Sequence, residues 1–307
     1  MLLVELPSEL LLGIFNLLGP EFFREDIGRL TVSRWWYDGF AWPTLVSNLE
    51  LTAKATAFTG GEALQSLQEF TRDETLVLRA QPHITALSLS LINFKLTSNG
   101  RHRPDTEADA ELEEWVATTK SSLAKLAANL PHCPRLQHLK VLVRARHGWA
   151  PLADTLADLF SARQLTSLHL DTAGSFRVVG IRDGEAGGDY SSTHFCSSIN
   201  ALFPSLRRLH YRMDFVCERL LEVPEEGTFP HLDEVIIDMT RHERLLPFPV
   251  SARWSRRCHP IPGDGPFLLR DDLERAATRL ASRLRNPRMV KVRWHGMFTL
   301  ALGLLML

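Results

Sequence analysis

The sequence feature that most constrains the fold is an apolar pattern that recurs from residue 84 onward. In each copy, apolar residues take the first, fourth and sixth positions of a short segment. The copies are Ile84-Leu87-Leu89, Leu136-Leu139-Val141, Leu165-Leu168-Leu170, Leu206-Leu209-Tyr211 and Leu232-Val235-Ile237. This pattern predicts short strands that repeat along the chain.

Three copies share a lead-in that contains proline: Cys133-Pro134, Phe203-Pro204 and Phe229-Pro230. Proline favours an extended approach to a strand, so the lead-in supports the repeat. The first residues of successive copies are 52, 29, 41 and 26 positions apart. The repeats are therefore irregular, and a strict solenoid of constant repeat length is excluded.

Helical periodicity lies between the predicted strands, at residues 107–130 and 150–160. Alternating strands and helices predict an α/β fold in which crossover helices join short parallel strands and stacking buries the apolar side of each unit. We therefore expect a curved, irregular solenoid. We expect loops at residues 98–109 and 177–193. The second of these segments is rich in glycine, aspartate and serine.

The first fifty residues have a different pattern. Pro7 and Glu9 indicate the start of a helix, and Gly19 indicates its end. The apolar positions of this helix are Leu10, Leu11, Ile14, Phe15, Leu17 and Leu18. They occupy more than one face, so a second surface must be covered besides the local core. Residues 26–40 predict further short helices, and Pro43 is expected to end the unit.

Three ordered elements resemble the F-box motif: Leu6-Pro7 with Ile14-Phe15, then Val32-Ser33-Arg34-Trp35-Trp36, then Pro43-Thr44-Leu45. The remaining chain is similar to the leucine-rich repeats that accompany F-boxes, particularly in divergent fungal proteins. The resemblance implies a three-helix F-box at residues 1–50, an irregular leucine-rich-repeat-like domain at 51–296 and an apolar tail at 297–307. The link at residues 19–25 is longer than is usual in the family.

The resemblance also implies a function. An F-box docks on a Skp-type adaptor, which bridges to a cullin ubiquitin ligase, so the chain is expected to be a non-catalytic substrate receptor. The residues implied at the adaptor surface or in its immediate support are Leu6, Pro7, Leu10, Leu11, Ile14, Phe15, Val32, Trp36, Pro43 and Leu45. Two alternatives stay open: these residues pack on the repeat domain, or the repeats form a scaffold that acts without a cullin.

A protein substrate is expected on the strand residues that alternate with the buried leucines. The candidate substrate-binding residues are His169, Asp171, Arg208, His210, Arg212, Glu234 and Asp238. The basic trio Arg208, His210 and Arg212 suits an acidic or phosphorylated segment. The alternative is that Glu234 and Asp238 of the next strand pair with the trio.

Several classes of function are excluded by composition and motifs. The chain has 35 basic and 36 acidic side chains, so it lacks an overall bias toward nucleic acid or anionic lipid. Residues 241–296 hold a local basic excess, but a helical apolar stripe there predicts a solvated face, and we expect no nucleic-acid partner. No nucleotide-binding, hydrolase or metalloprotease motif is present, so neither catalysis nor a cofactor is expected.

Cysteine spacing and hydropathy address the compartment. Four widely spaced cysteines fit neither a zinc site nor a disulfide framework, and they are typical of reduced thiols in the cytosol or nucleus. The tail at residues 297–307 is too short to span a bilayer, which needs about 20 helical residues. We therefore expect no spanning segment.

Overall fold

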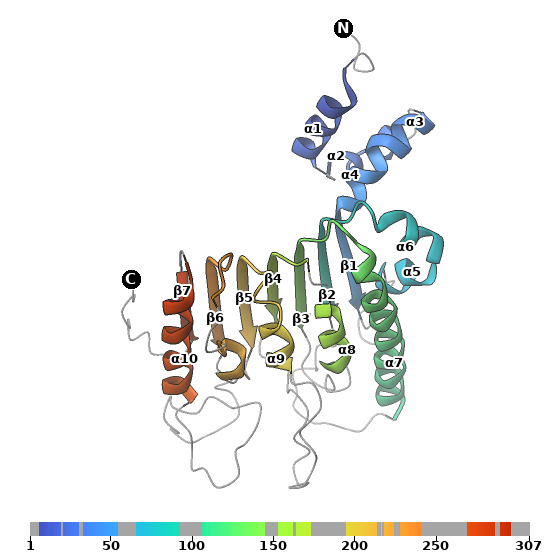
Figure 1. Ribbon diagram of the computed structural model, residues 1–307. Coiled ribbons are helices and arrows are strands. Elements are labelled where there is room, and N and C mark those ends of the chain that lie inside the picture. Colours follow the sequence, from blue (N-terminus) through green and yellow to red (C-terminus); the bar gives the residue numbers. More distant parts are fainter. Residues whose placement is uncertain are drawn as a thin grey trace.

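The structure is a computed structural model that describes most of the chain. It describes residues 6–19, 21–30, 33–54, 66–92, 106–144, 153–161, 164–172, 195–213, 216, 218–223, 228–240, 269–285 and 289–295. These residues form an N-terminal helical unit and an α/β sheet domain (Figure 1). The predicted tail and the predicted loop at 177–193 lie outside the described residues.

The sheet domain is built on parallel strands that lie in the same order as in the sequence. The strands are β1 Asn48–Lys54, β2 Ala86–Ile92, β3 His138–Arg144, β4 Ser167–Asp171, β5 Arg208–Met213, β6 Glu234–Thr240 and β7 Met289–His295. All neighbouring pairs are parallel. This confirms the predicted α/β class with parallel strands.

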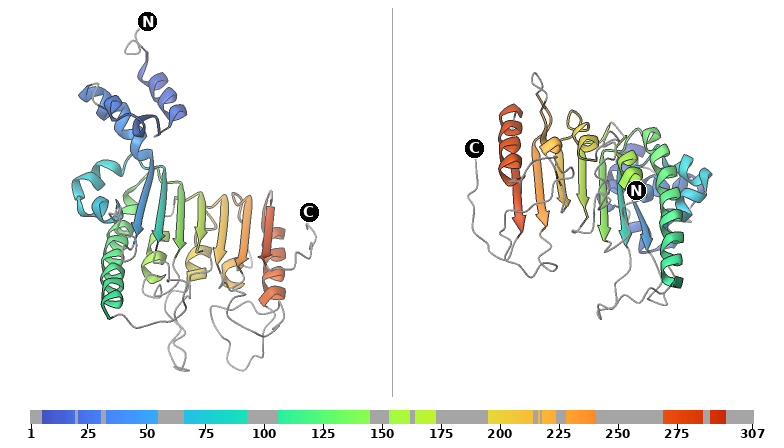
Figure 2. Two further views of the ribbon diagram at one scale, coloured as in Figure 1. Left: turned by 180° about the vertical axis from the view of Figure 1, so that it is seen from behind. Right: turned by 90° about the horizontal axis from the view of Figure 1, so that it is seen from below.

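The crossover segments lie on one side of this sheet. They are α5 Ser66–Arg72, α6 Glu74–Ala80, α7 Thr106–Asn129, η4 Leu130–His132, α8 Ala153–Asp158, η6 Leu159–Ser161, α9 Phe195–Asn200, η7 Glu218–Leu221 and α10 Leu269–Arg283. Parallel crossovers have a fixed hand, so an order that never reverses puts successive helices on the same face. Figure 2 shows α7 to α10 behind the strands, with no described helix on the opposite face.

The core lies between the sheet and these helices. Burial alternates along β2 and β4, so that one side chain in two is buried under the helices. Leu89, Leu170 and Tyr211 have no exposed surface. The five predicted strands correspond to β2 through β6. Strands β1 and β7 were not predicted. Val46, Leu49 and Leu51 repeat the same spacing at β1, whereas β7 keeps only the later two positions, as Val290 and Val292.

Backbone hydrogen bonds tie each unit of the sheet to the next, just before each strand begins. The N–H groups of Thr85, Gln137, Thr166, Arg207 and Asp233 each donate to the carbonyl of the equivalent residue one strand earlier, starting at Ser47, and the Met289 N–H donates to the Asp233 carbonyl. Their donor–acceptor distances are 2.7 to 3.1 Å. Insertions in the sequence therefore leave the register of the strands unchanged.

The helical unit consists of short segments. They are α1 Ser8–Leu18, α2 Glu21–Arg24, η2 Ile27–Leu30, α3 Arg34–Trp36, η3 Tyr37–Ala41 and α4 Trp42–Ser47. Part of the unusually long link after α1 is helical, as α2. The prediction that Pro43 ends the unit was wrong, because helical structure continues through it to Ser47. The turn before Pro43 is π-helical, and in it the Trp42 N–H donates to the Tyr37 carbonyl. A widened turn of this kind tolerates a proline, which has no N–H to donate.

The helical unit meets the sheet domain at the amino-terminal end of β1 (Figure 1). Helix α4 ends at Ser47 and β1 begins at the next residue, so the predicted domain boundary at residue 50 falls within β1. Arg79 of α6 forms an ion pair with Asp38. Its guanidinium also lies 5.0 Å from the Tyr37 ring centroid and 4.8 Å from that of Trp42. One arginine thus connects the two parts by charge and by cation–π contact.

Candidate functional site

Helix α1 has one broad apolar surface, of which one part is buried and the adjoining part is exposed. Leu11 and Phe15 are buried in a small core with Phe40 and Ala41. On the adjoining part of the helix surface, Leu10 is 57% exposed and Leu17 is 89% exposed. We call the exposed residues Leu10, Ile14, Leu17 and Leu18 the apolar α1 face. A helix whose apolar surface is wider than its local core leaves surface that favours a partner, at about 25 cal/mol per Å² removed from water.

Aromatic packing fixes the buried side of α1. The Phe15 ring lies 4.8 Å from the Trp36 ring with an interplanar angle of 87°, an edge-to-face contact. Its centroid is 6.2 Å from that of Phe22 and 6.1 Å from that of Phe40. These contacts hold α1 on the helices that follow it.

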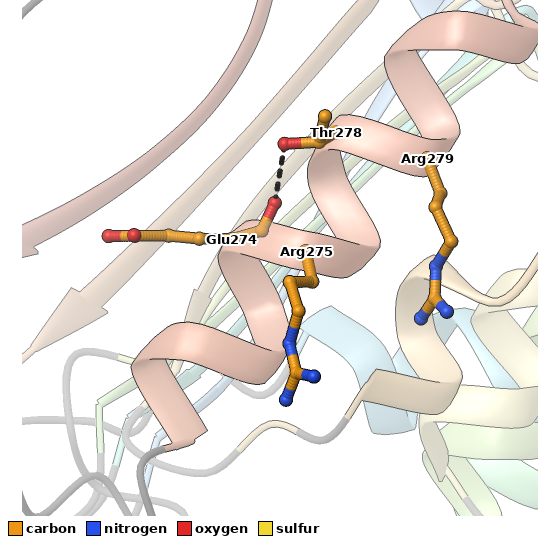
Figure 3. A pocket seen from close by; sticks show the side chains of 4 residues that line it. All are labelled: Glu274, Arg275, Thr278 and Arg279. Carbon is orange, nitrogen blue, oxygen red and sulfur yellow. Dashed lines mark hydrogen bonds between the residues drawn. The ribbon is translucent and has the colours of Figure 1, made fainter.

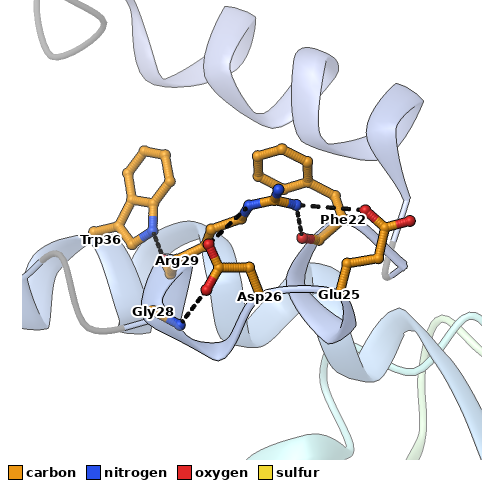
Figure 4. A network of polar contacts seen from close by, with 6 residues as sticks. All are labelled: Phe22, Glu25, Asp26, Gly28, Arg29 and Trp36. Atoms are coloured by element: carbon orange, nitrogen blue, oxygen red, sulfur yellow. Dashed lines mark hydrogen bonds and ion pairs between the residues drawn. The ribbon is translucent and has the colours of Figure 1, made fainter.

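A polar network supports the same core from the side of η2 (Figure 4). The Arg29 guanidinium donates to the Phe22 carbonyl and lies 4.2 Å from the Phe22 ring centroid. Arg29 also lies 3.7 Å from a Glu25 oxygen and 3.6 Å from an Asp26 oxygen. The Trp36 indole N–H donates to the Arg29 carbonyl at 2.7 Å. Arg29 therefore connects η2 to Trp36 of α3.

The structure divides the predicted adaptor residues into contact and support. Pro7, Leu10 and Ile14 are exposed, whereas Leu11 and Phe15 are buried. The partly buried residues are Leu6, Trp36, Pro43 and Leu45, of which all but Pro43 pack on the small core. Val32 lies outside the described residues.

Sequence reasoning did not select three exposed apolar residues of this unit as site residues: Leu17, Leu18 and Trp35. The spacing of Leu17 from Leu10 and Ile14 is helical, so periodicity was a signal that identifies it. Trp35 lies next to the selected Trp36, and its ring contacts Phe40 at 4.9 Å. The two tryptophans differ in burial, since Trp35 is exposed and Trp36 is partly buried.

The second candidate surface is the sheet face that no described helix covers. We call it the bare sheet face. In β3 to β7 it consists of His138, Lys140, Leu142, Ser167, His169, Asp171, Arg208, His210, Arg212, Glu234, Ile236, Asp238, Met289, Lys291 and Arg293. The predicted substrate-binding residues are among them, and pairing aligns Asp171, Arg212, Asp238 and Arg293 in one row across four strands.

Ion pairs run across this face. An Arg208 nitrogen lies 3.9 Å from Glu234, and an Arg212 nitrogen lies 3.4 Å from Asp171. The His210 Nε2 atom lies 2.9 Å from an Asp238 oxygen. Each member of the basic trio therefore has an acidic neighbour, as the pairing alternative expected for Glu234 and Asp238.

Two histidines stack on the same face. The rings of His169 and His210 are 4.5 Å apart with an interplanar angle of 22°. Burial, together with the electrostatic influence of the nearby His210 and Lys140, lowers the pKa of His169 below its usual 6.5. His169 is therefore neutral at pH 7.

Two basic residues of this face, Lys291 and Arg293, were not predicted as site residues. They lie on β7, whose Arg293 is 3.7 Å from Asp238. Strand β7 lacks the apolar spacing of the other repeats, but Val290 and Val292 alternate with Lys291 and Arg293. That period of two is the signal that predicts a strand there.

Other groups offer little chemistry. Four side chains of α10, namely Glu274, Arg275, Thr278 and Arg279, line an open hollow of about 500 Å³ (Figure 3). Burial raises the pKa of the Cys133 thiol to about 11, so it is protonated at neutral pH. In the described part of the chain, no three His, Cys, Asp or Glu side chains converge as a metal site requires. Nor does any described helix combine the length and hydropathy needed to cross a membrane.

Comparison with known proteins adds no family to this geometry. No protein-family model matches the chain. No curated protein matches its sequence. A functional proposal therefore rests on the residues and their arrangement.

Proposed function

We propose that this protein is a substrate receptor of a cullin-type ubiquitin ligase. Its helical unit acts as an F-box that binds a Skp-type adaptor, and its sheet domain acts as a leucine-rich-repeat-like surface that binds a protein substrate. The chain itself carries no catalytic group in this role. Ubiquitin transfer is done by the other subunits.

The observation that carries the proposal is the exposed apolar α1 face. Leu10 and Leu17 project away from the small core while Leu11 and Phe15 fill it. The alternative is that α1 packs on the repeat domain. It does not account for this exposure, because Leu10 and Leu17 are not buried against the helical unit or against the sheet domain. A partner that covers the face removes a row of large apolar groups from water.

The sheet domain supports the second half of the proposal. Ligands of open parallel sheets bind where the strand order reverses, and the order of the described strands does not reverse. What this topology offers instead is a broad face of alternating side chains, of the kind that repeat proteins use to bind other proteins. The direct junction between α4 and β1 links the two binding surfaces without a flexible connection.

The experiment is co-purification of the full chain with a Skp-type adaptor and a cullin. The test variant is Ile14→Asp with Leu17→Asp, which places charge on the apolar α1 face without touching the small core. The matched control is Leu78→Asp, because Leu78 is a 64% exposed leucine on α6 of the sheet domain. Wild type and control should capture both partners, and the test variant should capture neither while keeping the thermal unfolding of the wild type.

Two other outcomes separate the alternatives. Capture of the adaptor without the cullin favours an interaction scaffold that acts outside the ligase. No capture of the adaptor by the wild-type chain contradicts the F-box proposal, and equal capture by the test variant contradicts the role given to the apolar α1 face.

A further inference from the structure

We propose that the bare sheet face over β4 to β7 binds an acidic segment of a partner protein through an outer layer of guanidinium groups. The inference rests on the proposed receptor role, because it names the class of substrate that this face holds. Three arginines carry it, namely Arg208, Arg212 and Arg293.

The charges of this face lie in two layers. Two of the three carboxylates are shielded, since the side chain of Asp171 is 15% exposed and that of Asp238 is 7% exposed, whereas that of Glu234 is 33% exposed. The guanidinium groups are open, since the side chains of Arg208 and Arg212 are 64% and 42% exposed. A partner that approaches the face therefore meets mainly positive charge.

The arginines also keep unused donors. Arg212 directs one terminal nitrogen to Asp171, and its buried Nε atom has no acceptor among the described residues. Arg208 and Arg293 approach Glu234 and Asp238 through Nε, at 3.9 and 3.7 Å. A guanidinium carries five N–H donors, so its terminal nitrogens can still take a carboxylate in the planar, two-bond manner.

The spacing of the arginines suits an extended segment. Arg212 and Arg293 flank Asp238 in one row, so they are separated by two strand spacings, or about 10 Å. Three residues of an extended chain also cover about 10 Å. A segment that crosses the strands with an acidic residue at every third position thus matches the two arginines.

A protein segment fits this face better than a nucleic acid does. Single-stranded nucleic acids are held by aromatic rings on which bases stack, besides positive charge. The described side chains of the bare sheet face include no Phe, Tyr or Trp. The bound anions are therefore assigned to carboxylates of a protein.

The test measures binding of a labelled peptide to the full chain by fluorescence anisotropy. The probe carries glutamate at every third position, and its matched control carries glutamine instead. The first variant combines Arg208→Gln, Arg212→Gln and Arg293→Gln. The control variant combines Arg279→Gln, Arg283→Gln and Arg285→Gln, which removes equal charge from exposed residues in and just after α10.

A second variant guards against misfolding. Arg208→Gln with Lys291→Gln leaves Asp171 and Asp238 with the partners that they have in the wild type. We expect the glutamate peptide to bind and the glutamine peptide not to bind. The first variant should lose affinity about tenfold or more, the second about threefold, and the α10 control less than twofold.

Three results would overturn the inference: equal binding of both peptides, equal losses in the arginine variant and the α10 control, or tighter binding of an oligothymidylate than of the glutamate peptide. Capture of the Skp-type adaptor by the same samples separates this inference from the receptor role. Adaptor capture without peptide binding defeats only the present inference. Peptide binding without adaptor capture defeats the ligase proposal instead.

Discussion

The apolar α1 face and the bare sheet face are both left uncovered by the described chain, but they differ in chemistry. The first is a row of large aliphatic side chains on one helix, supported by a small aromatic core. The second is a broad array of paired charges, supported by fully buried leucines. Apolar burial gives affinity that depends little on salt, whereas charge pairing gives selectivity that salt weakens. The two surfaces are thus suited to different kinds of partner.

The largest effect should come from separating the two sides of α1. Phe15→Ala should lower the free energy of unfolding of the helical unit by about 3–5 kcal/mol, because it empties the centre of a small core. Leu17→Ala should change it by less than about 0.5 kcal/mol, since that side chain contacts mainly water. Urea unfolding followed by tryptophan fluorescence measures both. Similar losses for the two variants would mean that α1 has no free face.

The next largest effect should be a difference in how the affinities of the two surfaces depend on salt. Raising the ionic strength from 0.1 to 1 M shortens the Debye length from about 10 to about 3 Å. Affinity for the glutamate peptide should then fall about tenfold or more, while affinity for the adaptor should change less than about twofold. Titration calorimetry of the full chain with each ligand measures the two dependences. Parallel loss of both affinities would remove the contrast.

A smaller effect should appear at the junction of the two parts. Arg79→Ala removes the ion pair with Asp38 and the contacts with Tyr37 and Trp42. Because the side chains of Arg79 and Asp38 are 45% and 47% exposed, the loss should be about 1 kcal/mol. Arg79→Lys should recover only part of it, since lysine lacks the planar group. A double-mutant cycle with Asp38→Ala isolates the ion pair, and additive losses would show that the pair contributes nothing.

The smallest effect concerns pH. The pKa of His169 is lower in the folded state than in the unfolded state, so the unfolded chain takes up a proton first as pH falls below about 6.5. Protonation therefore favours unfolding, and stability present above that pH is lost on acidification. His169→Gln should flatten the stability curve between pH 7 and 5, whereas exposed His138→Gln should not. Thermal unfolding across that range is the measurement, and identical curves would contradict it.

Much of the fold follows from residues that repeat. Ile84, Leu136 and Leu206 each precede a strand at the same distance, so their spacing predicts where β2, β3 and β5 begin. Strand β1 was missed although Val46, Leu49 and Leu51 have the same spacing, because the first fifty residues were assigned to the helical unit. Pro43 was misjudged because a π-helical turn, which sequence patterns do not reveal, accommodates it.

The candidate site was less predictable, because it depends on burial between distant segments. The motif placed Ile14 and Phe15 together, although only the first is exposed. The charges of β4, β5 and β6 were expected to be close, since parallel strands in register align them. The exposure of each charge was not predicted, because Asp238 lies between His210 and Arg293, and Arg293 belongs to the unpredicted β7.

The most direct test of the central claim is amide hydrogen exchange of the full chain with and without a Skp-type adaptor. The exposed row on α1 predicts that the adaptor slows exchange in residues 8–18 and leaves β2 to β7 unchanged. Slowed exchange confined to the sheet domain, or none in α1, would contradict the claim that this helix is the docking surface.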